Sequence, residues 1–117
     1  MARRQDGATL KIVERYLDAL TRHDWDGLRA CLRDDVVRVG PFNDEYRGAD
    51  AYARFLEVLM PTLPGYSMDV ARVTYVDDRA YVELAETVAG HRTDEALVFE
   101  LVDDQIARVD VYIKTKP

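Results

Sequence analysis

The chain has 117 residues, of which 48% are hydrophobic and 32% are charged, and its formal net charge is −6. This length and composition fit a single globular domain over residues 1–117. The negative charge disfavours binding to the phosphate backbone of nucleic acids. No apolar run approaches the roughly 18 residues that a membrane span requires, so we expect neither a nucleic acid nor a membrane as partner.

The cysteine and histidine content narrows the chemistry further. Cys31 is the single cysteine, which excludes an intrachain disulfide, and the N-terminal MARRQDGATLK lacks the apolar segment of a secretory signal. We therefore expect a cytoplasmic protein. His23 and His91 lie far apart, and neither metal-ligand spacings nor glycine-rich nucleotide motifs occur. The sequence thus predicts no metal and no cofactor.

The first half of the chain has helical periodicity. Apolar residues at i, i+3, i+4 and i+7 spacing predict a helix over 8–22, and Asp24 can cap a short second helix that carries Trp25, Leu28, Cys31 and Leu32. A short strand is predicted over 36–40, followed by the polar loop PFNDEYRG. A third helix carries Tyr52, Phe55, Leu56 and Leu59 and ends at Pro61.

The second half has the alternation of β-strands. Strands are predicted over 66–76, 79–89, 92–102 and 105–115. Asp77-Asp78, the segment around Gly90 and Asp103-Asp104 supply the turns between them. Helices followed by antiparallel strands predict an α+β fold with three N-terminal helices packed on one face of a curved, mostly antiparallel sheet.

This order of elements resembles the nuclear transport factor 2-like superfamily, and within it the SnoaL-like branch. The stretches that carry the resemblance are RYLDALTRHDWDGLRACLRDDVVRVGP, YRGADAYARFL and QIARVDVYI. The resemblance implies a cystatin-like cone, in which the sheet wraps around a central pocket that the helices roof. It also implies a homodimer formed through the outer face of the sheet.

The superfamily holds ketosteroid isomerases, limonene-epoxide hydrolases, polyketide cyclases, dehydratases and non-catalytic binding modules. Tyr16 matches the oxyanion-hole tyrosine of the isomerases, whereas the position of their catalytic aspartate falls on Gly40. Their second oxyanion donor falls on Leu97, or on Glu95 under a different gap placement. The epoxide-hydrolase triad maps to Leu84, Glu86 and Val111, where Glu86 alone keeps an acid. Function must therefore be argued from this chain's own residues.

The hairpin after residue 79 brings two carboxylates into one place. A two-residue turn with Gly90 as its first central residue pairs Ala89 with Arg92 and so sets Glu86 opposite Glu95. Both then share the apolar face of the paired residues Leu84 and Leu97, Val82 and Phe99, and Ala80 and Leu101. Two opposed, buried carboxylates favour sharing one proton, which gives an acid beside a base. Alternatively, both lie solvated at the rim of the sheet, or a bulge turns Glu86 outward.

Two further polar residues are candidates for the same site. Tyr16 lies on the apolar stripe of its helix, either as a hydrogen-bond donor to a ligand oxygen or as a core residue. Arg38 is a candidate charge partner of the glutamates. The family resemblance turns Arg38 inward, whereas hydrophobic alternation turns Val37 and Val39 inward. Tyr52, Tyr66 and Tyr75 are predicted to be packing residues.

The expected pocket is apolar and suits a hydrophobic small molecule such as a polyketide, terpene or steroid-like compound. Its predicted lining residues are Leu56, Leu59, Met60, Val82, Leu84, Leu97, Phe99, Val109, Val111 and Ile113. These features favour an enzyme that uses Glu86, Glu95, Tyr16 and Arg38 for acid–base isomerisation, cyclisation, dehydration or hydrolysis. The alternative is a non-catalytic dimeric module of the same fold that binds ligands or partners.

Overall fold

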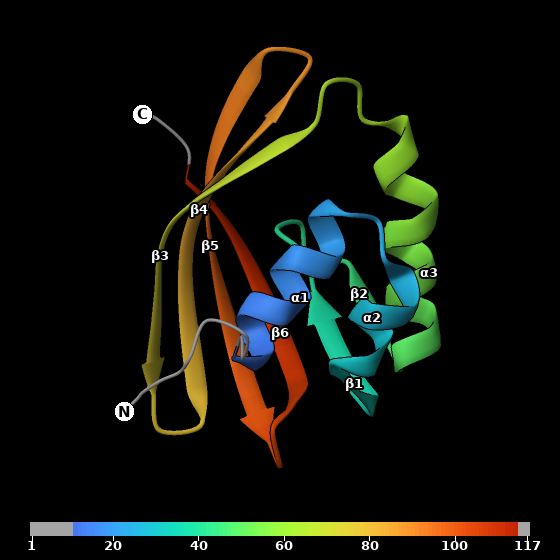
Figure 1. Ribbon diagram of the computed structural model, residues 1–117, viewed down its shortest axis with the longest axis vertical. Coiled ribbons are helices and arrows are strands. Elements are labelled where there is room, and N and C mark those ends of the chain that lie inside the picture. Colours follow the sequence, from blue (N-terminus) through green and yellow to red (C-terminus); the bar gives the residue numbers. More distant parts are fainter. Residues whose placement is uncertain (1–10, 115–117) are drawn as a thin grey trace.

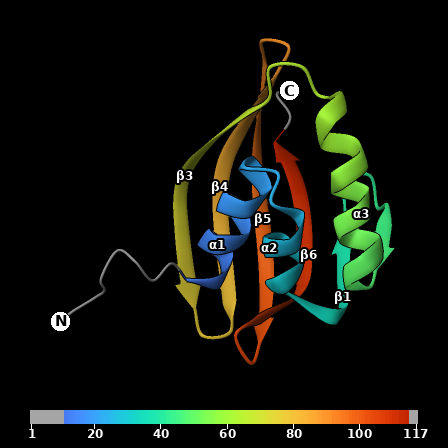
Figure 2. The ribbon, with the colours of Figure 1, turned by 45° about the vertical axis from the view of Figure 1, so that its right-hand side comes forward.

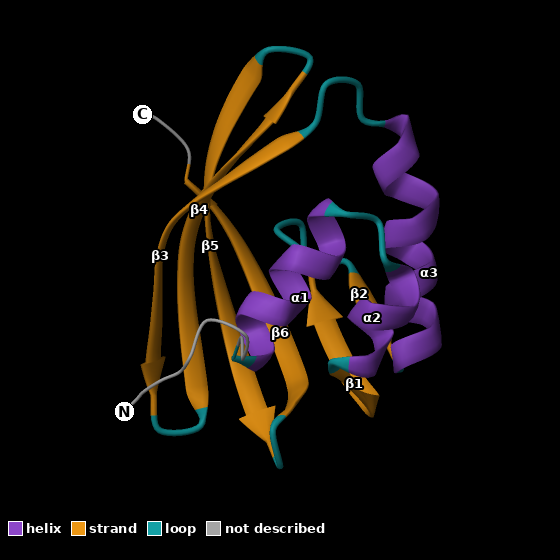
Figure 3. Cartoon of the chain, in the orientation of Figure 1, coloured by secondary structure: helices purple, strands orange, loops and turns teal. Residues whose placement is uncertain are grey.

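The computed structural model describes residues 11–114; the start of the first predicted helix (8–10) and residue 115 of the last predicted strand lie outside them. The chain forms an α+β fold with three α-helices and a six-stranded mixed sheet (Figures 1 and 3). In chain order the elements are α1 (Ile12–Thr21), α2 (Trp25–Ala30), β1 (Leu32–Val39), β2 (Glu45–Arg47), α3 (Ala49–Leu59), the 3-10 helix η1 (Met60–Thr62), β3 (Ser67–Val76), β4 (Arg79–Val88), β5 (His91–Val102) and β6 (Gln105–Lys114).

The helices follow from local sequence signals. Apolar residues of α1 form one buried stripe that includes Val13, Tyr16 and Leu20. The Asp24 side chain accepts a hydrogen bond of 3.0 Å from the Gly27 amide. Asp24 is therefore the N-cap of α2, as predicted. α3 ends at Leu59, and Pro61 follows in η1, where its missing amide proton costs little.

Two predictions for the first half were wrong. Cys31 and Leu32 do not belong to the second helix: α2 ends at Ala30, and β1 begins at Leu32 rather than at residue 36. The loop predicted over PFNDEYRG contains the short strand β2, which pairs with β1 through Arg38 and Tyr46. Both segments are rich in charged residues because they contribute few side chains to the core, so their strand character is weak in the sequence.

The sheet has the strand order β2-β1-β6-β5-β4-β3, in which β1 and β6 run parallel and every other pair is antiparallel. All three helices lie on one side of this sheet, and the long strands bend along their length (Figures 1 and 2). The central contact is made by Tyr16 of α1, whose ring meets that of Phe99 on β5 edge-on at 5.5 Å between centroids.

The β4–β5 hairpin turns one residue earlier than the sequence predicted. Its turn residues are Ala89 and Gly90, both with positive φ (51° and 82°), and Val88 pairs with His91. Positive φ at both central residues is the pattern of a type I′ turn, which disfavours alanine. The Ala89 amide donates a hydrogen bond of 2.8 Å to the Pro64 carbonyl, which supports this conformation.

The earlier turn changes every predicted pair in the hairpin. Glu86 pairs with Thr93 rather than Glu95, and Glu95 pairs with Leu84. Val82 likewise pairs with Leu97, and Ala80 with Phe99. Because the shift equals two residues, each side chain keeps the predicted face of the sheet. Glu86 and Glu95 are therefore diagonal neighbours on one face instead of direct partners.

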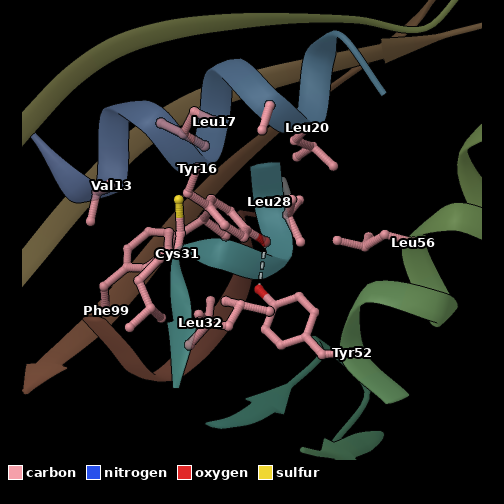
Figure 4. Close-up of a cluster of buried hydrophobic side chains, with 14 of the residues drawn as sticks. Val13, Tyr16, Leu17, Leu20, Leu28, Cys31, Leu32, Tyr52, Leu56 and Phe99 are labelled. Atoms are coloured by element: carbon pink, nitrogen blue, oxygen red, sulfur yellow. Dashed lines mark hydrogen bonds between the residues drawn. The ribbon is translucent and has the colours of Figure 1, made fainter. Parts of the chain in front are cut away.

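The hydrophobic core lies between the inner face of the sheet and the helices. Its fully buried side chains include Tyr52, Phe99, Leu28, Ile106, Val13, Val36, Val82 and Val109. Figure 4 shows the part of this cluster in which α1, α2 and α3 meet Phe99. None of the helices within residues 11–114 combines the length and apolar character that a bilayer crossing requires.

Candidate functional site

A cavity of about 100 Å³ lies between the helices and the inner face of the sheet. All four predicted polar residues line it: Tyr16, Arg38, Glu86 and Glu95. Seven of the ten predicted apolar residues do so as well, namely Leu56, Leu59, Met60, Leu84, Leu97, Val109 and Val111. The fold thus gathers side chains from α1, β1, α3, β4, β5 and β6 around one small space.

Three predicted lining residues lie elsewhere. Val82 and Phe99 are 0% exposed and belong to the core, because they face the helices directly. Ile113 borders a hollow associated with the opposite face of the sheet. The sequence prediction also missed Leu20, Leu63 and Met68, which line the cavity. Leu20 lies on the predicted apolar stripe of α1, whereas Leu63 and Met68 flank the Pro64-Gly65 break and carry no periodic signal.

Glu86 and Glu95 are both half-buried, and Glu86 affects the protonation of Glu95. Burial raises the pKa of Glu95 to about 9, and hydrogen bonding to Glu86 and the negative charge of Glu86 act in the same direction. Arg38 acts against these effects. Glu95 therefore carries a proton at neutral pH and faces a neighbouring carboxylate inside the cavity.

Tyr66 completes the polar cluster at the glutamates. Its hydroxyl donates a short hydrogen bond to Glu86 Oε2. Burial, reinforced by Glu86, raises the pKa of Tyr66 far above its usual value, so the hydroxyl remains a donor. The sequence predicted only a packing role for Tyr66, because nothing in its local pattern reveals a partner on β4.

The hydroxyls of Tyr16 and Tyr52 form a second polar contact in the buried region. Their oxygens are 2.5 Å apart, and their rings meet nearly at right angles (Figure 4). Burial raises the pKa of the Tyr16 hydroxyl, and it raises that of Tyr52 further still. Both groups are therefore neutral, and Tyr16, which lines the cavity, has its hydroxyl held by Tyr52. The sequence predicted Tyr52 as packing and gave no sign of this bond.

Arg38 points inward, as the family resemblance implied and as hydrophobic alternation did not. Its side chain is 13% exposed and lines the cavity. The guanidinium carbon lies 4.9 Å from the ring centroid of Phe55 and 5.9 Å from that of Tyr52. Phe55 in turn stacks on Tyr46 at 4.1 Å between centroids. These aromatic contacts favour the cation and restrict its position.

The tyrosine pair can be tested by a double-mutant cycle. Tyr16→Phe and Tyr52→Phe should each lower the free energy of unfolding by about 1–2 kcal/mol, because each removes the buried hydrogen bond between the two hydroxyls. The double variant should lose clearly less than the sum. Urea unfolding would measure all three, with Tyr112→Phe as the control, since Tyr112 is 57% exposed. Strictly additive losses would contradict the pairing.

Among residues 11–114, no group of three or more His, Cys, Asp or Glu side chains is placed to hold a metal ion. The cavity instead combines the protonated Glu95, the carboxyl group of Glu86, the hydroxyl of Tyr16 and the guanidinium of Arg38 within apolar walls, and Tyr66 hydrogen-bonds to Glu86. Such a set can donate and accept protons next to an apolar ligand.

The α+β fold is of the nuclear transport factor 2-like type. The family described as "SnoaL-like domain" matches residues 13–109. The chain belongs to this SnoaL-like family. A comparison of the sequence with curated proteins finds no match.

Solved structures with the same fold carry several descriptions. A putative ketosteroid isomerase from Kribbella flavida has a TM-score of 0.83 at 22% identity, with 91% of this chain and 77% of that chain covered. An LEH-like epoxide hydrolase from M. tuberculosis has a TM-score of 0.74 at 26% identity, covering 88% and 80%. An NTF2-like protein of unknown function from Mesorhizobium loti has a TM-score of 0.81 at 20% identity, covering 89% and 88%.

Proposed function

We propose that the protein is a SnoaL-like enzyme that transfers protons to and from a mostly apolar small molecule in the inner cavity. The observation that carries the proposal is the position of Glu95, a carboxyl that holds a proton, beside Glu86 on the cavity wall. An acid and a base side by side are what proton transfer between two sites of one ligand requires.

Each polar residue of the cavity has a role in this proposal. Glu95 donates a proton, and Glu86 accepts one from the ligand once Tyr66 yields the oxygen it occupies. Tyr16 donates a hydrogen bond to a ligand oxygen, and Arg38 compensates negative charge that develops there. Isomerisation, cyclisation, dehydration and hydrolysis all use such steps. The similarity to structures described as an isomerase and an epoxide hydrolase supports this range.

The volume of the cavity limits the size of the ligand. Its volume of about 100 Å³ is below the roughly 300–1,000 Å³ of sites for drug-sized ligands. Leu59, Met60, Leu63 and Met68 form one wall from a single segment of the chain. We expect a compact apolar molecule to bind in the cavity as it stands, and a polyketide, terpene or steroid-like ligand to require displacement of this wall.

The same small cavity favours a second candidate function, a non-catalytic module that binds a ligand. A thermal-shift screen with apolar compounds, followed by turnover assays on the compounds that bind, separates the two. For an enzyme, Glu86→Gln should lower turnover by about 10²–10⁴-fold, while Glu83→Gln, on the outer face of the same strand, should not. Binding without turnover, unchanged in Glu86→Gln, would support the module.

We also propose that the outer face of the sheet forms a homodimer. That face carries a hollow of about 580 Å³ whose lining includes Ala71, Ala85, Ala96 and Tyr112. Tyr112 in this lining and Tyr81 on the same face are 57% and 41% exposed, and the rest of the lining carries charges of both signs, such as Arg92 and Asp94, which a second copy could pair. Asp110 alternates with the buried Val109 and Val111 on β6 and so belongs to this face, where it pairs with Arg108 at 2.8 Å.

Ala96→Arg should convert the dimer to a monomer, because it places a long charged side chain in the hollow where a second copy would pack. Sedimentation velocity at micromolar concentration would measure the change. Arg33→Ala, in β1 and outside the lining of the hollow, is the control that should leave the dimer intact. A wild-type protein that sediments as a monomer would contradict the proposed dimer.

A further inference from the structure

Arg38 and Asp44 each have one buried polar atom that lacks a hydrogen-bond partner. Arg38 Nη1 and Asp44 Oδ1 have no hydrogen-bond partner within residues 11–114. The closest approach between the two side chains is 4.0 Å, from Nη1 to Asp44 Oδ2. This distance is too long for a hydrogen bond but short enough for strong charge attraction. A buried polar atom without a partner is costly and uncommon, so this loose pair calls for an explanation.

The loop after β1 is built to place the Asp44 carboxylate beside residue 40. The Gly40 amide donates to the Asp44 carbonyl at 2.8 Å, and the Asn43 amide donates to the Gly40 carbonyl at 3.0 Å. Asn43 takes a positive φ of 63° to close the turn. A Cβ on Gly40 would lie 2.6 Å from Asp44 Oδ2 and 2.7 Å from its Cγ. The carboxylate of Asp44 thus fills space that a side chain at position 40 would take.

Arg38 has acidic side chains on two sides. Asp44 lies on the side of the loop, and Glu86 and Glu95 share the lining of the cavity with Arg38. The positive charge of Arg38 lowers the pKa of Glu95 against the effect of burial. If the guanidinium moved toward the glutamates, this effect would grow, and the pair would lose its proton more easily.

The other groups around Arg38 leave this competition undisturbed. Tyr16 of α1 and Tyr52 of α3 are buried and neutral, and Tyr52 interacts with Arg38 through a hydrogen bond that carries no opposing charge. Phe55 packs against the guanidinium, and Val109 of β6 and Tyr46 of β2 pair with the backbone of Arg38. Among the groups described around Arg38, only Asp44 and the two glutamates compete for its charge.

We infer that Asp44 is a positioning residue that holds the Arg38 guanidinium back from Glu86 and Glu95. The loose geometry fits this role, because a guanidinium without a close hydrogen bond to Asp44 can move when a ligand brings its own negative charge. Asp44 thereby sets how readily the glutamates give up a proton. The inference rests on the proposed function, in which these glutamates share one proton.

A titration of the protein itself tests the inference. The carboxyl carbons of Glu95 and Glu86 are followed by ¹³C NMR in the wild type, Asp44→Asn and Gly40→Ala. Both variants should lower the midpoint of Glu95 by about one pH unit or more. Gly40→Ala keeps every charge and only pushes the flexible Asp44 side chain aside, so it remains informative if Asp44→Asn perturbs folding.

Two controls isolate the path through Arg38. Glu45→Gln removes an equal charge one residue further on, from a side chain that pairs with Arg47 at 2.9 Å, and should leave Glu95 unchanged. In an Arg38→Met background, Asp44→Asn should no longer lower the Glu95 midpoint. A shift that persists in that background would show that Asp44 acts directly and would overturn the inference.

The failure of the inference differs from the failure of the proposed function. A wild-type Glu95 that titrates high, with the same midpoint in Asp44→Asn and Gly40→Ala, would overturn the role of Asp44 and leave the proton pair intact. A wild-type Glu95 that titrates like an ordinary glutamate would overturn the proton pair and the inference with it.

Discussion

Glu95→Gln should be more stable than the wild type at pH 9 and about equally stable at pH 5. Burial and Glu86 raise the pKa of Glu95 from an ordinary 4.5 to about 9 in the folded protein. The folded state therefore binds the Glu95 proton more tightly than the unfolded state. Its contribution to stability is fully present below pH 4.5 and is lost progressively as the pH rises through 9.

We expect the wild type to lose about 2 kcal/mol of unfolding free energy as the pH rises. This is well below the value that the whole pKa shift would imply, because water screens a half-exposed carboxyl. Glutamine mimics the protonated carboxyl and does not titrate, so the loss should be absent in the variant. Urea unfolding at pH 5, 7 and 9 would measure it, with Asp94→Asn, which lies on the outer face of β5, as the control. Parallel pH profiles of wild type and Glu95→Gln would contradict the assignment.

Phe99→Ala should lower the free energy of unfolding by about 3–5 kcal/mol. The ring is 0% exposed and packs edge-on against Tyr16, between the sheet and α1. Its removal leaves a cavity where the strands meet the helix, and a domain stabilised by about 5–15 kcal/mol loses a large share of that stability.

Chemical unfolding at pH 7 would measure the effect of Phe99→Ala. Val102→Ala is the comparison on the same strand, since Val102 is 42% exposed and should cost less than about 1 kcal/mol. A loss for Phe99→Ala as small as that for Val102→Ala would show that the packing between β5 and α1 is not as described.

The sequence predicted the elements whose burial pattern is regular. α1 and α3 each present one apolar stripe, and the strands of the second half alternate over most of their length, so their bounds agree with the structure to within a residue or two over the described part of the chain. β2 and the start of β1 were missed. Apart from the buried Leu32, their residues are partly or fully exposed, and pairing with a distant strand, which sequence periodicity does not report, fixes their conformation.

Glu86 and Glu95 both line the cavity although the predicted register was wrong. The turn at Ala89 and Gly90 requires positive φ at an alanine, which local preference argues against. The resulting error of two residues preserved the face of every side chain, so Glu86 and Glu95 still reach the cavity.

The partners of the site residues could not be predicted. The bonds from Tyr66 to Glu86 and from Tyr52 to Tyr16 join residues 20 and 36 positions apart and depend on how separate elements pack. Similarly, the position of Asp44 beside Arg38 depends on a turn through Asn43 and on the absence of a side chain at Gly40. Such contacts are set by tertiary structure rather than by any local pattern.

The most direct test of the proton pair is a ¹³C NMR titration of the Glu86 and Glu95 carboxyls in the wild-type protein. The account predicts that Glu95 keeps its proton through neutral pH and titrates near 9. Because the two carboxyls interact, the Glu95 resonance should also shift when Glu86 ionises. Two independent midpoints in the ordinary range of solvated glutamates, near about 4.3, would contradict it.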